Sequence, residues 1–150
     1  FLTNIYGITQ FFLQGTPMPL ELKKSAVDLG IITNNPEPML AFYRDLLGFR
    51  YEGALDVPGG TTMHRLWCGD SLIKILQHRQ EIPAAPSGGM NGATGYRYWT
   101  ITVGNLDEIT AACEEAGYAI AIPLTVMRPG VRISVVEDPD GNWVEFLENS

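Results

Sequence analysis

The sequence is poor in cysteine and in positive charge, and it contains no long apolar run. Its two cysteines, Cys68 and Cys113, form neither a disulfide framework nor a zinc-ligand spacing. Ten Lys and Arg against 17 Asp and Glu give a net charge of -7 without any basic run, which argues against nucleic acid and anionic membranes as partners. No apolar stretch is long enough to span a bilayer. These absences favour a cytoplasmic protein with reduced, buried thiols.

The motifs of several large enzyme classes are also missing. The chain has no G-x-S-x-G nucleophile elbow, no P-loop and no G-x-G-x-x-G fingerprint. The Gly88-Gly89 pair lies in a stretch rich in Pro, Ala, Gly and Ser, not between a strand and a helix. We therefore interpret it as part of a flexible linker.

What the sequence does contain is a pair of matched strand patterns, each with one charge at its centre. DPDGNWVEFLE (138–148) predicts a tight turn followed by a strand with Glu145 in its middle. Earlier, LIKIL (72–76) follows a Gly-Asp-Ser turn and holds Lys74 at its centre. A charge in an otherwise apolar strand is costly unless it is paired, so these two residues are the first candidates for a site.

The two strands close two similar halves of the chain. Each half predicts a strand, a helix and three more strands, and each helix is expected to begin at an asparagine (Asn35, Asn105) and to end at a glycine (Gly48, Gly117). Equivalent positions in the two halves are about 70 residues apart in the sequence. One βαβββ unit cannot bury both faces of its sheet, so the duplication predicts an α+β fold in which two modules form a curved, cup-shaped mixed sheet with the helices outside.

The expected domain organisation follows from this repeat. Residues 25–150 form a single domain, with module one at 25–79, a linker at 80–95 and module two at 96–150. Residues 1–24 do not fit the repeat, and we expect an ordered arm on the same domain or on a neighbouring subunit. The alternative is that this arm covers a pocket with Tyr6, Phe11 or Phe12.

Two segments resemble the vicinal oxygen chelate superfamily, which includes glyoxalase I, extradiol dioxygenases and bleomycin-resistance proteins. They are FYRDLLGF (42–49) at the end of the first helix pattern and DPDGN (138–142) before the last strand, and the resemblance extends over about 25–148. The metal enzymes of that superfamily carry ligands on the first and last strand of each module, usually His or Gln, Glu, His and Glu. The matching positions here hold, in order, Asp28, Lys74, Tyr98 and Glu145.

Only Glu145 keeps the usual identity at these positions, and Lys74 is the decisive departure. A protonated ammonium has no lone pair and repels a dication. The resemblance therefore predicts a member that lacks the usual metal and needs no cofactor, with an ion-paired cluster of Asp28, Lys74 and Glu145 in its place. The alternative is a divalent metal held by Asp28 and Glu145, which His64 could join.

Further candidates come from residue chemistry. The catalytic candidates are Lys74, Tyr98, His64 and Glu145; histidine suits acid–base work near neutral pH, and His64 or its neighbour Arg65 should face the concave side. The candidates for ligand binding are Asp28, Trp143, Arg132 and Arg97. The arginines could pair with the carboxylate of an acidic substrate, and Trp143 should share a face with Glu145. The alternatives are a hydrogen-bonded sheet histidine, solvated arginines and a core tryptophan.

Three functions are compatible with these patterns. The first is a metal-independent protein that binds an aromatic or antibiotic-like small molecule; resemblance to the bleomycin-resistance branch implies sequestration in a cleft between modules, often at a homodimer interface. The acidic composition would suit a cationic or neutral compound. The second is an enzyme of the same fold, a lyase, isomerase, hydrolase or dioxygenase-like protein. The third is a structural or regulatory dimer without a small ligand.

Overall fold

The structure is a computed structural model that describes residues 20–150. The expected N-terminal arm lies almost wholly outside the described residues, and so do the three aromatic residues named for it. None of the helices in the described range has the length and apolar character needed to cross a bilayer.

Module one has the predicted order of elements. They are β1 (Leu29–Ile32), α1 (Pro36–Leu40) continued by a π-helical turn η1 (Ala41–Leu46), β2 (Arg50–Val57), β3 (Thr61–Cys68) and β4 (Ser71–His78). The strands form a four-stranded sheet in the order β1-β4-β3-β2, in which β1 runs parallel to β4 and the other neighbours are antiparallel.

Module two repeats this plan after a linker that contains a single 3-10 turn. The elements are η2 (Gly89–Asn91), β5 (Tyr98–Thr102), α2 (Leu106–Glu115), β6 (Ile120–Arg128), β7 (Val131–Glu137) and β8 (Trp143–Asn149). The sheet order β5-β8-β7-β6 matches that of module one, and β5 is parallel to β8. The duplicated α+β architecture is therefore confirmed. The outer strand β6 includes Pro123, at an irregularity in its pairing with β7.

The helices begin and end where expected, but their N-termini are satisfied differently. Asn35 and Asn105 precede the helices, yet neither makes a side-chain capping bond. At α2 the Glu148 carboxylate accepts the backbone N–H of Leu106 at 3.2 Å. An acid from β8 thus occupies the position that a capping side chain would take, and it joins the helix to its sheet.

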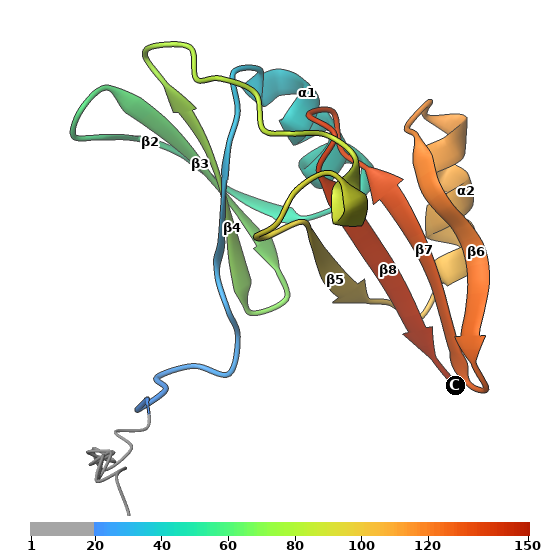
Figure 1. The fold of residues 1–150 in the computed structure, drawn as a ribbon. Helices are drawn as coiled ribbons and strands as arrows, with labels where there is room; N and C mark the ends of the chain where they lie inside the picture. Colours follow the sequence, from blue (N-terminus) through green and yellow to red (C-terminus); the bar gives the residue numbers. More distant parts are fainter. Residues whose placement is uncertain (1–19) are drawn as a thin grey trace, which may run out of the picture.

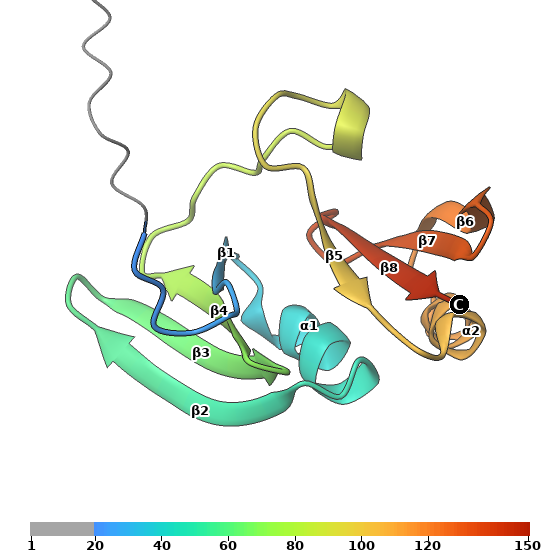
Figure 2. The same cartoon turned by 90° about the horizontal axis from the view of Figure 1, so that it is seen from below.

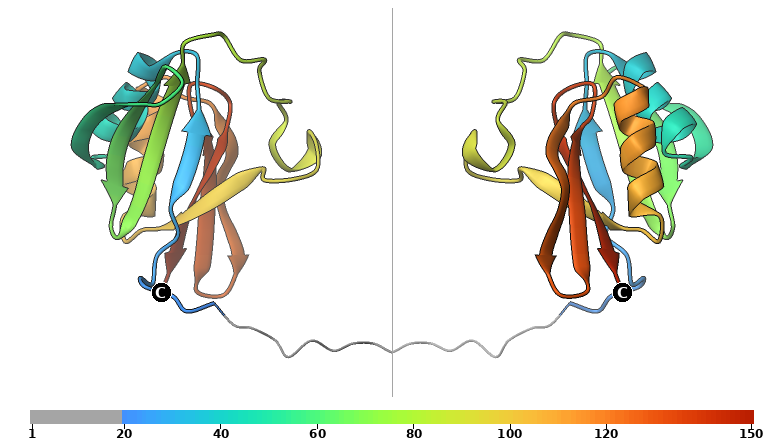
Figure 3. Two further views of the ribbon diagram at one scale, coloured as in Figure 1. Left: turned by 90° about the vertical axis from the view of Figure 1, so that its left-hand side faces the viewer. Right: turned by 90° about the vertical axis from the view of Figure 1, so that its right-hand side faces the viewer.

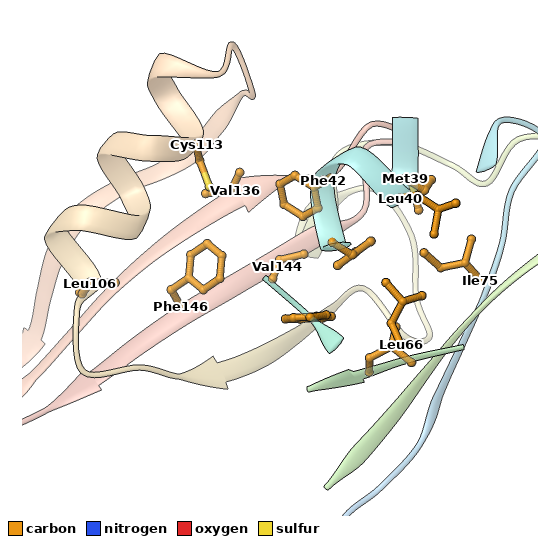
Figure 4. Close-up of a cluster of buried hydrophobic side chains, with 13 residues drawn as sticks. Met39, Leu40, Phe42, Leu66, Ile75, Leu106, Cys113, Val136, Val144 and Phe146 are labelled. Atoms are coloured by element: carbon orange, nitrogen blue, oxygen red, sulfur yellow. The ribbon is translucent and has the colours of Figure 1, made fainter. Parts of the chain in front are cut away.

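One hydrophobic core joins the two modules (Figure 4). It contains residues from α1, η1 and β4 of module one and from α2, β7 and β8 of module two. The Phe42 ring meets the Tyr118 ring edge-on, with 4.7 Å between centroids. The buried members are Met39, Leu40, Phe42, Tyr43, Phe49, Leu66, Ile73, Ile75, Leu106, Cys113, Val136, Val144 and Phe146.

Both helices lie in the angle between the two sheets, as Figures 1 and 2 show. Helix α1 packs on β4, and α2 packs on β6, β7 and β8, which is visible from two sides in Figure 3. The linker crosses module two on the side of its sheet away from α2 (Figure 2). In the described chain no ladder joins the sheets, so β1 and β5 are outer strands. Because both helices lie in the angle between the sheets, the helix-free faces of the two sheets point in different directions.

Candidate functional site

The helix-free face of the first sheet, which we call the module-one face, carries Lys74 at its centre. Ile73 and Ile75 point into the core, so Lys74 between them points to the opposite side. In the strand register Lys74 lies opposite Arg65 on β3 and opposite Gly30 on β1. Lys74 is half-buried, and it has no hydrogen-bond or ion-pair partner among residues 20–150. Every other half-buried Lys or Arg in that range has a partner, namely Arg44, Arg65, Arg97 and Arg132.

Asp28 does not pair with Lys74 as predicted. Its carboxylate accepts hydrogen bonds from Lys24 Nζ and from the backbone N–H of Leu72, the latter at 2.8 Å. The Lys24 bond and then the Leu72 bond lower the pKa of Asp28, and Lys74 adds only a weaker Coulombic attraction. The predicted ion-paired cluster of Asp28, Lys74 and Glu145 is therefore wrong. A nearer ammonium, four residues before Asp28, takes the place expected for Lys74.

An aromatic ring with cations on it occupies the other end of the module-one face. Lys24 Nζ and the Arg50 guanidinium make cation–π contacts with the Trp67 indole, each 5.5 Å from a ring centroid. Glu52 accepts hydrogen bonds from Arg65 Nε at 2.6 Å and from Trp67 Nε1 at 3.2 Å. The Arg65 bond is the main cause of a lowered pKa at Glu52. This network holds the indole and the Arg65 guanidinium in fixed positions beside Lys74.

The helix-free face of the second sheet, the module-two face, carries Glu145 and Tyr98. Val144 and Phe146 are in the core, so Glu145 points away from α2. Thr100 lies opposite Glu145 in the register and donates its hydroxyl to Glu145 Oε1 at 2.7 Å. Tyr98 precedes Thr100 by two residues on the same strand and is largely exposed. Glu145 makes no ion pair within the described chain, and its hydroxyl partner comes from its own sheet.

The linker covers Trp143, the tryptophan that was predicted to line a pocket. Trp143 does share the face of Glu145, but a Cβ placed on Gly89 would lie 2.0 Å from the indole, so the linker backbone packs directly on the ring. Trp143 Nε1 donates to Glu137 at 3.1 Å. Arg97 donates Nε to the Gly89 carbonyl at 2.7 Å and Nη2 to the Pro86 carbonyl at 2.7 Å. Arg97 and Trp143 therefore hold the linker in this structure.

Two other candidates lie on the helix side of their sheets. His64 lies opposite Ile75, a core residue, and its Nδ1 is 3.0 Å from the Tyr51 hydroxyl. Arg65 is the member of the pair on the helix-free face, so His64 does not share a face with Lys74. Arg132 binds Glu148 and Asp107, the latter at 2.6 Å from Nη2 to Oδ2. This places Arg132 at the N-terminus of α2, away from the module-two face.

The residues present do not fit the metal site that the resemblance implies. Asp28 and Glu145 stand on different sheets, and each is already held by hydrogen bonds. Lys74, the second strand position, supplies a charge that opposes a dication. Within 20–150 no three His, Cys, Asp or Glu side chains converge on one point.

An apolar cleft of about 390 Å³ separates the outer strands of the two sheets. Its walls include Leu29 and Ile73 from module one and Trp99 and Ile101 from module two. Cys68 also lines this cleft and a neighbouring one of about 280 Å³. Both clefts lie where the modules meet, and Asp28 is one of the residues that line the larger one.

A buried bond between the modules was not foreseen from the sequence. The Tyr43 hydroxyl donates to Asp138 Oδ2 at 2.7 Å, and both side chains are buried. Burial, followed by the negative charge of Asp138, raises the pKa of Tyr43 well above its usual value, so the hydroxyl remains a donor. Asp138 also accepts the backbone N–H groups of Asp140 and Asn142. The only sequence signal was that both residues belong to the two segments of the resemblance.

Comparison with protein families gives one match over most of the chain. The model described as Glyoxalase/Bleomycin resistance protein/Dioxygenase superfamily matches residues 26–146. A search of curated proteins gave no match.

Solved structures show the same fold at low sequence identity. A glyoxalase family protein from Enterococcus faecalis is 27% identical, with a TM-score of 0.63 over 85% of this chain and 97% of that protein. One from Bacillus cereus is 16% identical, with a TM-score of 0.74 over 88% and 99%. A structure titled lactoylglutathione lyase, from Agrobacterium tumefaciens, is 21% identical, with a TM-score of 0.60 over 85% and 96%. The last two likenesses, both under 25% identical, concern the fold alone.

Proposed function

The chain belongs to the glyoxalase/bleomycin resistance protein/dioxygenase superfamily, and from this premise we propose that it binds a small organic molecule on the module-one face without the usual metal of the metal-dependent members. The observation that carries the proposal is Lys74. It occupies a strand position that holds a metal ligand in those members, on a face free of helices, and its ammonium has no partner in the described chain. Trp67 lies on the same face, with Lys24 and Arg50 over its ring.

We further propose that a second copy of the chain completes the site. The two helix-free faces point in different directions, so one chain supplies only half of an enclosed site (Figure 2). The described part of the module-one face has a positive sum of charge, since four cations (Lys24, Arg50, Arg65 and Lys74) outnumber its two carboxylates (Asp28 and Glu52). The module-two face carries the carboxylates of Glu137 and Glu145. A two-fold dimer would apply one face to the other with complementary charge.

A ligand screen combined with metal analysis tests the binding proposal. Neutral, cationic and anionic aromatic compounds should be compared by thermal shift, because a ligand stabilises the state that it binds. We expect at least one class to raise the melting temperature of metal-depleted protein, and the same shift after adding divalent metal. A stoichiometric divalent metal in purified protein that is required for the shift would contradict metal independence.

Light scattering coupled to size exclusion tests the dimer. We expect twice the chain mass for the wild type and a weaker dimer for Glu145→Lys, because this change places like charges across the interface. Glu81→Lys, on an exposed linker residue without a partner in the described range, is the matched control. A monomeric wild type would contradict the completed site.

A further inference from the structure

We infer that the module-one face selects a small organic carboxylate, whose anionic group binds the Lys74 ammonium and whose apolar body lies over the neighbouring strands. This inference rests on the proposed function and names the chemical class of its ligand. It departs from the expectation that an acidic protein should prefer cationic or neutral compounds, and the reason is the local distribution of charge.

The module-one face is locally positive although the chain has a net charge of -7. Among residues 20–150, four cations lie on it, and two carboxylates oppose them. The pairs Lys24–Asp28 and Arg65–Glu52 are each neutral in sum. Arg50 and Lys74 are left over, and Arg50 stacks on Trp67. The charges on this face therefore favour an incoming anion, and Lys74 is the cation on it that has neither an ion pair nor a stacked ring within the described residues.

The strand register places Lys74 opposite another cation, which destabilises the fold unless an anion binds there. Arg65 and Lys74 are directly opposite each other on antiparallel strands and share a face. Like charges in such a pair are destabilising. Glu52 compensates the Arg65 charge through a hydrogen bond, whereas Lys74 has no hydrogen bond or ion pair in residues 20–150 and only a weaker Coulombic attraction to Asp28. A carboxylate bound at Lys74 would form the missing charge-assisted hydrogen bond and relieve this repulsion.

The surface next to Lys74 has room for the rest of such a ligand. On β1 the residue opposite Lys74 is Gly30, where an added Cβ would meet only Leu76 Cδ1, at 3.9 Å. Leu76 and Leu72 share the face of Lys74 because they are two residues away on the same strand. The absent side chain at position 30 thus leaves space, bounded by aliphatic groups, beside the ammonium. A carboxylate with a hydrocarbon or aromatic body fits this combination.

Three probes of one shape test the charge preference. Calorimetric titration of metal-depleted protein with 3-phenylpropanoate, 3-phenylpropanol and 3-phenylpropylamine keeps the body constant and changes only the terminal group. We expect the acid to bind at least about tenfold more tightly than the alcohol, the amine to bind weakest, and the acid's affinity to fall with added salt. Equal affinity of acid and alcohol overturns the carboxylate assignment but leaves the proposed small-molecule function standing.

Variants of Lys74 locate the effect. Lys74→Met should lose the preference for the acid while keeping the affinity for the alcohol, and Lys74→Glu should reverse the preference toward the amine. Lys23→Met, a matched change at an exposed lysine paired with Glu21, should behave as the wild type. Circular dichroism melts confirm that each variant is folded, and the reversal by Lys74→Glu does not depend on Lys74→Met being stable. Unchanged acid affinity in Lys74→Met overturns the inference.

Two further outcomes are decisive. If no probe binds the wild type but other compounds raise its melting temperature, the carboxylate inference fails and the proposed function stands. The second outcome is that Lys74→Met and Glu145→Gln weaken self-association equally and the acid does not bind. Lys74 would then pair with a carboxylate of the second copy, and the inference would be wrong.

Discussion

The Tyr43 hydroxyl donates a 2.7 Å hydrogen bond to Asp138 across the junction of the two modules. Tyr43 belongs to the FYRDLLGF segment and Asp138 to the DPDGN turn, the two segments in which the sequence resembles its superfamily. Both side chains are buried, and Asp138 also holds its own turn through Asn142. In this chain the two segments therefore connect the modules through a buried hydrogen bond.

Tyr43→Phe should destabilise the fold by about 1.5–3 kcal/mol, the range for a hydrogen bond to a charged group. The ring remains in the core, so the loss reports the hydroxyl bond to Asp138. Urea unfolding of both proteins measures the difference. Tyr118→Phe is the control, because its ring packs on Phe42 but its hydroxyl has no hydrogen-bond partner in the described part of the chain. Equal losses in both variants would mean that the Tyr43 bond contributes nothing specific.

Stability should decline in acid partly through the Arg132 cluster. The hydrogen bond from Arg132 lowers the pKa of Glu148, and it does the same for Asp107. A carboxyl group whose pKa is lower in the folded state stabilises the fold above its unfolded pKa, and this contribution disappears as the pH falls through the folded value. Glu148→Gln should therefore reduce stability at pH 7 and make the stability less dependent on pH below about pH 5.

Urea unfolding at several pH values measures this dependence. Glu81→Gln, which changes an exposed linker carboxyl group, is the control and should leave the acid dependence as it is in the wild type. If the free energy of unfolding changes with pH in the same way in Glu148→Gln and in the wild type, the proposed contribution of Glu148 to acid sensitivity is wrong.

Gly89→Ala should displace the linker from Trp143. The new methyl group would lie 2.0 Å from the indole, whereas the one in Gly95→Ala, also at a positive φ (+96°), would have no atom within 4 Å. Acrylamide quenching of tryptophan fluorescence should therefore increase for Gly89→Ala and not for Gly95→Ala. Removing Trp143 by Trp143→Phe should abolish the difference; if it persists, another tryptophan is responsible.

The two cysteines should differ in reactivity toward a thiol reagent. Burial raises the pKa of Cys113 to about 11 and also raises that of Cys68, which is only half-buried and lines both clefts. The thiolate is the reactive form, so Cys68 should react first and Cys113 only when the protein opens. Absorbance assays with an aromatic disulfide on Cys68→Ser and Cys113→Ser measure each rate. Fast reaction in Cys68→Ser would show that the core around Cys113 opens readily.

The fold could be predicted because its signals are local and occur twice. Turn residues, strand alternation and helix ends in 25–150 each specify an element, and the duplication specifies how the elements combine. The alternation also placed Trp143 on the face of Glu145, as observed.

The environment of the site could not be predicted, because it depends on contacts between distant segments. Lys74 was expected to meet Asp28, but Lys24, which the repeat pattern excluded from the domain, is the closer cation. The linker has no periodic pattern that would place Gly89 on Trp143. The choice between His64 and Arg65 depended on which residue pairs with Ile75, and strand alternation alone leaves that register open.

Pro123 in the outer strand β6 has a consequence for solubility. The strand exposes three apolar side chains, Leu124, Val126 and Met127, next to this proline. An outer strand with apolar residues invites the growth of intermolecular sheets, and a proline interrupts that growth because it has no N–H to donate. The proline therefore interrupts the edge of module two as a template for fibrous aggregation.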